Sequence, residues 1–310
     1  MDRLFTKFYN WNIFHIMYCD GSSFMSNVEE VDAVYNITYR GGRIFDAMME
    51  ELVLNKGMGN ANSAILAGSS AGGLATILQC DKFRALFHNS SRVKCISDSG
   101  FFIHAENFMG ADWREARFFN VISTHGLANV LPTSCTTKFS PTLCLFPENL
   151  VEDLRTPLFL IESAFDKFQV GQNVFSPNVV NHDPKWSNCT NDIMFCNWTH
   201  IKIMKDFRAT FIETLNSTID KSSSIGYFVH GCYRHGHILE KQDWICSSLV
   251  GNNVLAHKTI GQAVSDWYFD KSTTVFREID MRNDLPRMCR NDYTVLDFER
   301  NCSVALQPSV

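Results

Sequence analysis

The sequence predicts an α/β fold, a mostly parallel sheet with helices on both faces, in one domain spanning residues 1–310. Short apolar runs bounded by turn residues alternate with segments of helical periodicity, which is the pattern of parallel strands and their crossover helices. Hydrophobic residues make up 45% and charged residues 20% of the chain, enough apolar material for a sizeable core. A single α/β domain of 310 residues is therefore expected.

Five apolar runs are expected as buried strands and three further segments as helices. The strands are expected at Asn12–Tyr18, Ser63–Ala67, Val93–Ser97, Thr156–Ile161 and Ile225–Val229. The helices are expected at Gly42–Leu54, at Ile201–Ile219, and in a segment that starts with Gly72–Leu78. Helical spacing in the first helix predicts a buried face made by Ile44, Met48, Leu52 and Val53. The polar stretch from Gly171 to Thr199 is expected as an excursion over the surface.

The segment Gly68-Ser-Ser-Ala-Gly72 matches the pattern G-x-S-x-G directly after an expected strand and before an expected helix. In this context the pattern predicts a nucleophile elbow, a tight turn that exposes Ser70 above the sheet, with Ser69 as the rival hydroxyl. Small residues at Gly68, Ala71 and Gly72 leave room for such a turn. The backbone N–H of Ala71, at the start of the helix, is the expected oxyanion donor.

An elbow serine needs a base and an acid, expected in the chain order Ser, Asp or Glu, His. Asp166 follows the strand Thr156–Ile161, and His235 follows the strand Ile225–Val229, so both are placed at the carboxyl ends of strands. The predicted triad is therefore Ser70, Asp166 and His235, which requires neither metal nor cofactor.

Spacing alone leaves alternatives open for the base and the acid. His230 and His237 share the loop with His235, and a metal-binding pair of His235 and His237 is also conceivable, although no matching acidic cluster accompanies it. Asp98 and Asp266 are the rival acids, and a structural role in the next turn is more typical of a residue placed as Asp98 is.

Cysteines and glycosylation sequons point to the secretory pathway. The chain has eleven cysteines, none in a CxxC pair, and two pairs are close enough in sequence to predict small disulfide-closed loops: Cys135 with Cys144, and Cys189 with Cys196. Six N-x-[ST] sequons accompany them, at Asn36, Asn89, Asn188, Asn197, Asn216 and Asn301. An odd number of cysteines predicts at least one thiol without an intrachain partner.

Other features bear on partners and location. The N-terminal residues do not form a signal peptide, so either the signal has been removed or the gene product starts late. No run of about 18 apolar residues predicts a membrane span. The net charge of −5 and the absence of a basic run argue against a nucleic-acid partner.

Five stretches together resemble the plant pectin acetylesterase family, to which the Wnt-deacylating Notum esterases are related. They are Tyr18-Cys-Asp-Gly-Ser-Ser-Phe24, Gly68-Ser-Ser-Ala-Gly-Gly-Leu-Ala-Thr76, Ser97-Asp-Ser-Gly-Phe-Phe102, Arg155-Thr-Pro-Leu-Phe159 with Ser163-Ala-Phe-Asp166, and Asp266-Trp-Tyr-Phe-Asp270. The resemblance runs from about Tyr9 to about Phe276. It implies an α/β-hydrolase fold and assigns the triad to the same residues, Ser70, Asp166 and His235.

Two departures from the resembled family affect the expected site. The family carries an upstream segment with a signal peptide, a first strand and a Gly-Gly-Gly-Trp loop that contributes oxyanion donors, and this chain begins after it. One oxyanion donor fewer typically lowers kcat by about 10²–10³, and a missing strand exposes a sheet edge. The family also has a cysteine where this chain has Gly236, so the histidine loop is expected to be looser.

These observations predict a secreted serine carboxylesterase that hydrolyses acetyl esters of pectin (homogalacturonan) in the plant cell wall. Arg234 is a candidate for offsetting repulsion between the acidic chain and anionic galacturonate, although a solvated loop position is equally compatible with the sequence. The alternatives are a Notum-like lipid-acyl esterase and a truncated, weakly active or inactive homologue that binds polysaccharide or a protein partner.

Overall fold

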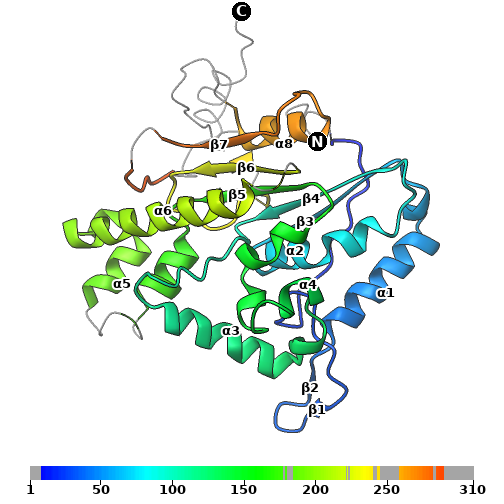
Figure 1. Cartoon of the computed structure of the whole chain (residues 1–310), viewed down its shortest axis with the longest axis horizontal. Helices are drawn as coiled ribbons and strands as arrows, with labels where there is room; N and C mark the ends of the chain where they lie inside the picture. The colour runs from blue at the N-terminus through cyan, green and yellow to red at the C-terminus, as the bar shows by residue number, and fades with distance from the viewer. Residues whose placement is uncertain are drawn as a thin grey trace, which may run out of the picture. The chain divides into compact units, whose positions relative to one another are not determined.

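The computed structural model describes residues 8–176, 179, 184–220, 222, 224–239, 243–244, 258–281 and 284–289. Figure 1 shows the arrangement of its helices and strands along the chain. The helices are α1 (Gly41–Leu54), α2 (Ala71–Arg84), α3 (Ala111–His125), α4 (Thr133–Thr136), α5 (Pro184–Asn191), α6 (Trp198–Ile219), α8 (Ile260–Tyr268) and the π-helix η6 (Gln169–Val174). The strands are β1 (Val31–Asp32), β2 (Ile37–Thr38), β3 (Ser63–Ser69), β4 (Arg92–Asp98), β5 (Leu158–Ser163), β6 (Ile225–His230) and β7 (Arg277–Ile279).

Short 3₁₀ helices connect the larger elements. They are η1 (Met58–Asn60), η2 (Leu127–Asn129), η3 (Leu143–Leu145), η4 (Pro147–Asn149), η5 (Val151–Asp153) and η7 (Ile193–Phe195).

The main sheet has five strands in the order β3-β4-β5-β6-β7, and β1 with β2 forms a separate antiparallel hairpin. The pairs β3 with β4 and β6 with β7 are parallel. Parallel strands that follow one another in both sequence and space require crossover connections, and α2 lies between β3 and β4 and α8 between β6 and β7. The predicted α/β class, with a mostly parallel sheet, is confirmed.

The chain groups into two compact units. One unit, which we call the serine unit, comprises His15–Leu158 and Thr210–Ile225, and the other, the histidine unit, comprises Phe159–Ala209 with the described residues of 8–14 and from Gly226 onward.

In the serine unit, α1 and α2 pack with β3 and β4 around one apolar cluster. It contains Phe45, Met49 and Leu52 of α1, Ala64 of β3, Ala75 and Phe83 of α2, and Val93 of β4, with Phe24 and Phe87. The buried face of α1 therefore runs through Phe45, Met49 and Leu52, whereas Ile44 is exposed. The expected face was displaced by about one position, because Phe45 and Met49 were left out of it.

Most expected elements are present, but two expectations were wrong. The segment Asn12–Tyr18 forms neither strand nor helix, and Ile13 and Met17 are 79% and 71% exposed. An apolar run becomes a buried strand only where a neighbouring strand pairs with it, which local sequence does not encode. The stretch from Gly171 to Thr199 is not wholly a surface excursion, because it contributes η6, α5 and the buried residues Asn173, Val174 and Phe175.

Four disulfides link described cysteines. Cys135–Cys144 and Cys189–Cys196 confirm the two predicted loops, and Cys80–Cys95 and Cys232–Cys289 join more distant positions. Among the described residues Cys19 is an exposed free thiol. Cys246, Cys302 and the sequon at Asn301 lie outside the described residues.

Candidate active site

Ser70 occupies the sharp turn between β3 and α2. Its backbone has φ 58° and ψ −121°, a conformation that residues with a Cβ rarely adopt. The Ser70 N–H donates to the carbonyl of Asp98 at 2.8 Å, and the Ser70 carbonyl accepts from Leu74 N–H at 3.0 Å to start the helix. Backbone strain maintained by surrounding bonds is characteristic of functional turns, and here it has the form of a nucleophile elbow.

Glycines allow the backbones around this turn to approach closely. A Cβ on Gly68 would lie 2.1 Å from the carbonyl oxygen of Gly72, and one on Gly73 would lie 2.8 Å from the carbonyl oxygen of Asp98. A Cβ on Gly100 would lie 2.5 Å from the carbonyl carbon of Gly73. The expected role of Gly68 is confirmed. At Gly72 the expectation was wrong, because a Cβ there meets nothing within 4 Å. The close backbone approach is instead made at Gly73 and Gly100.

Ala71 is the first residue of α2. The N–H groups in the first turn of a helix have no acceptor within the helix and carry the positive end of its dipole. The Ala71 N–H is therefore chemically suited to an anionic oxygen beside Ser70, and its role as oxyanion donor stays a prediction.

Asp166 and His235 meet in the histidine unit. Asp166 lies three residues beyond the end of β5 and is fully buried. Its Oδ1 accepts from the backbone N–H of Gln169 at 2.7 Å, and its Oδ2 lies 2.7 Å from Nδ1 of His235. Because a carboxylate only accepts, Nδ1 of the neutral imidazole carries the proton, and Nε2 is left as the basic nitrogen. The ring of Phe168 stacks on His235 with centroids 5.2 Å apart.

The loop that carries His235 is bonded to the segment that carries Asp166. Ala164 N–H donates to the carbonyl of His230 at 2.9 Å, and Lys167 N–H donates to the carbonyl of Arg234 at 3.2 Å. The hydroxyl of Ser163 donates to the carbonyl of Cys232. Ser163 and Phe168 were not recognised as site residues from sequence, although both flank Asp166 directly.

A disulfide also secures this loop. Gly236 occupies the position where the resembled family has a cysteine, but Cys232 of the same loop is bonded to Cys289. The disulfide thus ties the loop that carries His235 to Cys289, and the looseness expected from Gly236 stays a prediction.

The structure separates the three histidines that spacing could not distinguish. His235 contacts Asp166, whereas Nε2 of His230 lies 2.7 Å from Nε2 of His237. His230 and His237 are 2% and 1% exposed. Burial and the positive charges of Arg287 and Arg234 hold the pKa of His230 well below its usual range.

The rival acids have other partners. Asp98 is buried beside the elbow, where its main-chain oxygen binds Ser70 N–H and its carboxylate accepts from the hydroxyl of Ser99 at 3.4 Å. Asp266 forms ion pairs with Lys258, at 2.9 Å, and with Lys271. Asp98 therefore has the structural role expected of it.

Arg234 is not a solvated loop residue. Its Nε lies 2.6 Å from Oδ2 of Asp243, which is 5% exposed, and donates to the carbonyl of Gly236 at 3.2 Å. Arg234 thus braces the loop, and its charge is compensated by Asp243.

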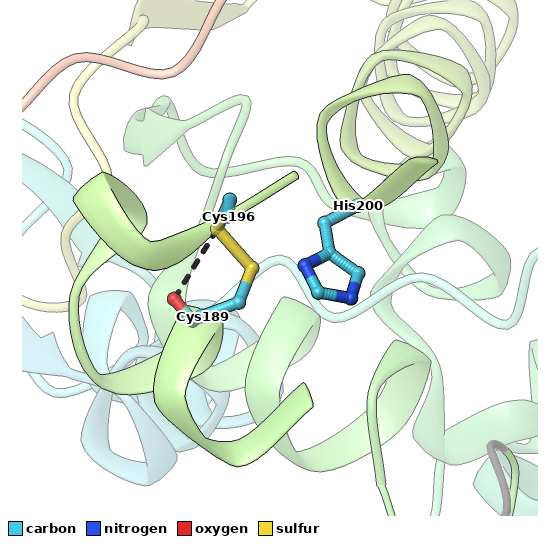
Figure 2. A group of neighbouring side chains, drawn as sticks. All are labelled: Cys189, Cys196 and His200. Atoms are coloured by element: carbon cyan, nitrogen blue, oxygen red, sulfur yellow. Dashed lines mark hydrogen bonds between the residues drawn. A yellow bond between two sulfur atoms is a disulfide. The ribbon is translucent and has the colours of Figure 1, made fainter. Parts of the chain in front are cut away.

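One group in the described part of the chain brings three potential metal ligands together: Cys189, Cys196 and His200. Figure 2 shows that the two sulfurs are joined as a disulfide beside the imidazole. Disulfide sulfurs are not thiolates, which are the form that binds metal. The group therefore offers one imidazole, and its Nδ1 already accepts from Asn197 N–H at 3.2 Å.

The fold and the elbow together define the α/β-hydrolase class. The sequence model described as Pectinacetylesterase matches residues 5–290. Pectin acetylesterase 7 of Arabidopsis thaliana is 40% identical over 88% of this chain and 68% of its own length, and pectin acetylesterase 11 of the same plant is 37% identical over the same shares. The chain belongs to the pectinacetylesterase family and is a carboxylic ester hydrolase.

More distant similarity extends to an animal esterase. The palmitoleoyl-protein carboxylesterase NOTUM of Drosophila melanogaster is 27% identical over 76% of this chain and 33% of its own length. A solved structure of the Wnt deacylase Notum from Drosophila superposes with a TM-score of 0.63 at 21% identity, covering 87% of this chain and 70% of that one. This likeness shows the shared fold. No helix among the described residues has the length and apolarity to span a membrane.

Proposed function

We propose that the chain is a secreted esterase that removes acetyl groups from acetylated pectin, with Ser70, His235 and Asp166 as its catalytic triad. The observation that carries the proposal is the 2.7 Å hydrogen bond between Nδ1 of His235 and the buried carboxylate of Asp166. It gives His235 the tautomer that a general base requires, and Ser70 occupies the sharp strand-to-helix turn typical of a nucleophile.

The steps follow from the chemistry of these groups. Nε2 of His235 takes the proton of Ser70 as its Oγ attacks the acetyl carbonyl, and Asp166 stabilises the imidazolium. The Ala71 N–H donates to the oxyanion of the tetrahedral intermediate. His235 then protonates the departing sugar oxygen. In the second half of the reaction His235 takes a proton from water as the water attacks the acetyl-serine, and then returns that proton to the Ser70 oxygen as acetate leaves.

Substrate and location are inferred from the relatives and the disulfides. The relatives of 34–40% identity are named pectin acetylesterases, which supports an acetylated polysaccharide as the substrate. Four disulfides support folding in an oxidising compartment, which fits a cell-wall enzyme.

The test is acetate release from acetylated pectin by the purified protein, beside Ser70→Ala and Ser69→Ala variants. We expect release by the wild type and by Ser69→Ala, and loss of about 10⁴-fold or more in Ser70→Ala. Release that survives in Ser70→Ala would refute the triad. A palmitoleoylated peptide is assayed in parallel, and its preferential hydrolysis would refute the substrate assignment in favour of a lipid-acyl esterase.

A further inference from the structure

Two histidines beside the proposed base have no part in the triad. His230 is the last residue of β6, and His237 lies two residues beyond His235. Their Nε2 atoms are 2.7 Å apart, and their rings meet edge to face with centroids separated by 4.5 Å and planes at 81°. Both imidazoles are almost fully buried, so this bond is shielded from water.

The hydrogen bonds fix the protonation of both rings. The backbone N–H of Cys232 donates to Nδ1 of His230 at 3.1 Å, so Nδ1 carries no proton and neutral His230 is protonated at Nε2. That Nε2–H donates to His237, whose Nε2 must therefore be unprotonated. A proton added to Nδ1 of His230 would place its N–H against the N–H of Cys232, and a proton added to Nε2 of His237 would place its N–H against the N–H of His230. The pair exists only while both rings are neutral.

The pair closes the loop that carries His235. Before His235, the loop is secured to the Asp166 segment through the carbonyls of His230, Cys232 and Arg234, as described above. After His235, the chain turns at Gly236, where φ is +81°, and returns to the start of the loop through His237. His235 thus lies between two fixed ends, one of which depends on the imidazole pair.

We propose that His230 and His237 form a positioning pair, whose hydrogen bond holds His235 in the place where its Nδ1 meets Asp166. The inference rests on the proposed function, in which His235 is the base. Neither residue of the pair has a step in the proposed reaction. The pair acts through the loop, and its loss lowers turnover without removing a catalytic group.

The charges around the pair favour its neutral form. Arg287 is ion-paired with Asp280, and Arg234 is ion-paired with Asp243. Burial is the largest cause that opposes a proton on His230, and both guanidinium groups act in the same direction. A proton on His230, which would break this hydrogen bond, is therefore disfavoured at pH values where an exposed imidazole would bind it.

The test compares His237→Gln with His237→Leu. The glutamine amide reaches as far as imidazole Nε2 and offers a carbonyl acceptor to His230, whereas leucine has similar bulk and no acceptor. With p-nitrophenyl acetate at pH 8, we expect His237→Gln to keep the wild-type kcat and His237→Leu to lose about ten- to a hundredfold in kcat with KM unchanged. Circular dichroism verifies that each variant is folded.

Three outcomes would overturn the positioning role: wild-type kcat in folded His237→Leu, equal losses in the two variants, or a change confined to KM. A second measurement needs no variant. Nitrogen-15 NMR of histidine-labelled wild type at pH 8 should show a coupling across the hydrogen bond between one imidazole protonated at Nε2 and a second protonated at Nδ1, and its absence would overturn the pair. If Ser70→Ala remains active, the triad fails, and the NMR result still decides whether the pair exists.

Discussion

The serine unit and the histidine unit hold their site residues by different means. Ser70 is held by main-chain contacts, with its N–H bonded to Asp98 and with glycine backbones packed at Gly68, Gly73 and Gly100. His235 is held mainly by side chains and a cross-link: the carboxylate of Asp166, the hydroxyl of Ser163 and the disulfide at Cys232. The position of Ser70 therefore depends on the absence of side chains, whereas the position of His235 depends on side chains and a disulfide.

The largest effect that follows from this contrast is at Asp166. Asp166→Asn preserves the size of the side chain, but an amide can present its NH₂ to Nδ1 and stabilise the wrong tautomer of His235. We expect kcat to fall by about 10⁴-fold with the fold intact. Initial rates on p-nitrophenyl acetate measure the loss.

Asp266→Asn is the matched control for Asp166→Asn, because Asp266 pairs with surface lysines and has no role in the proposed triad. It should retain wild-type rates. If kcat fell equally in Asp166→Asn and Asp266→Asn, the loss at Asp166 could not be assigned to its contact with His235.

The next effect concerns the cross-link of the histidine unit. Replacing Cys232 and Cys289 together by alanine opens a link between positions 57 residues apart, and we expect the free energy of unfolding to fall by about 2–5 kcal/mol. Turnover should fall as well, because Cys232 belongs to the loop of His235. Urea unfolding and kcat are measured on the same preparation.

The Cys135–Cys144 pair of the serine unit is the control for that cross-link. It closes a link of only nine residues, so its removal should cost less stability and leave kcat unchanged. If removing either disulfide lowered kcat equally, the contrast between the two units would not hold.

Glycine positions test the serine unit. Gly68→Ala places a Cβ against the carbonyl of Gly72, and we expect overpacking to lower the free energy of unfolding by about 1–3 kcal/mol and to displace Ser70. Gly72→Ala, four residues away, meets open space and should be neutral or stabilising. Thermal unfolding and esterase rates of the two variants are compared. Equal behaviour would show that close backbone approach does not define the elbow.

The same contrast explains what sequence could predict. The elbow was predictable because main-chain geometry has a local signature, a strand, two glycines and a helix start around Ser70. Asp166 was predictable from its place after a strand. Spacing could not distinguish among His230, His235 and His237, because the choice depends on which ring reaches Asp166 across 69 positions of the chain.

The expectations from sequence that were wrong also depend on tertiary contacts. Asn12–Tyr18 has the composition of a strand, and nothing within it indicates whether another strand pairs with it. Arg234 lies beside Asp243, and the backbone of Gly73 in α2 lies against Gly100; both arrangements arise from segments that come together only in the fold. Local patterns therefore indicated the turn at Ser70 and the place of Asp166 after a strand better than they indicated the tertiary contacts around them.

The smallest effect is a difference in pH dependence between the units. Glu148 of the serine unit accepts from His104 N–H at 3.2 Å, and burial raises the pKa of its carboxyl to about 7. The folded state then holds a proton that the unfolded state releases above about pH 4.5, so stability from this group is lost as pH rises toward 7. His230 has the opposite sign, because its lowered pKa removes stability as pH falls below 6.5.

Glu148→Gln isolates the contribution of the serine unit. The amide keeps an acceptor for His104 N–H and does not titrate, so the decline in unfolding free energy between pH 5 and pH 8 should be shallower than in the wild type. Urea unfolding across that range measures the slope. An unchanged slope would mean that Glu148 is ionised in the folded protein at pH 5, and that burial does not govern its carboxyl. A shallower slope in Glu148→Gln would support the raised pKa of Glu148. The loss of stability at acid pH would then be assigned to the histidine unit, where the pKa of His230 is lowered.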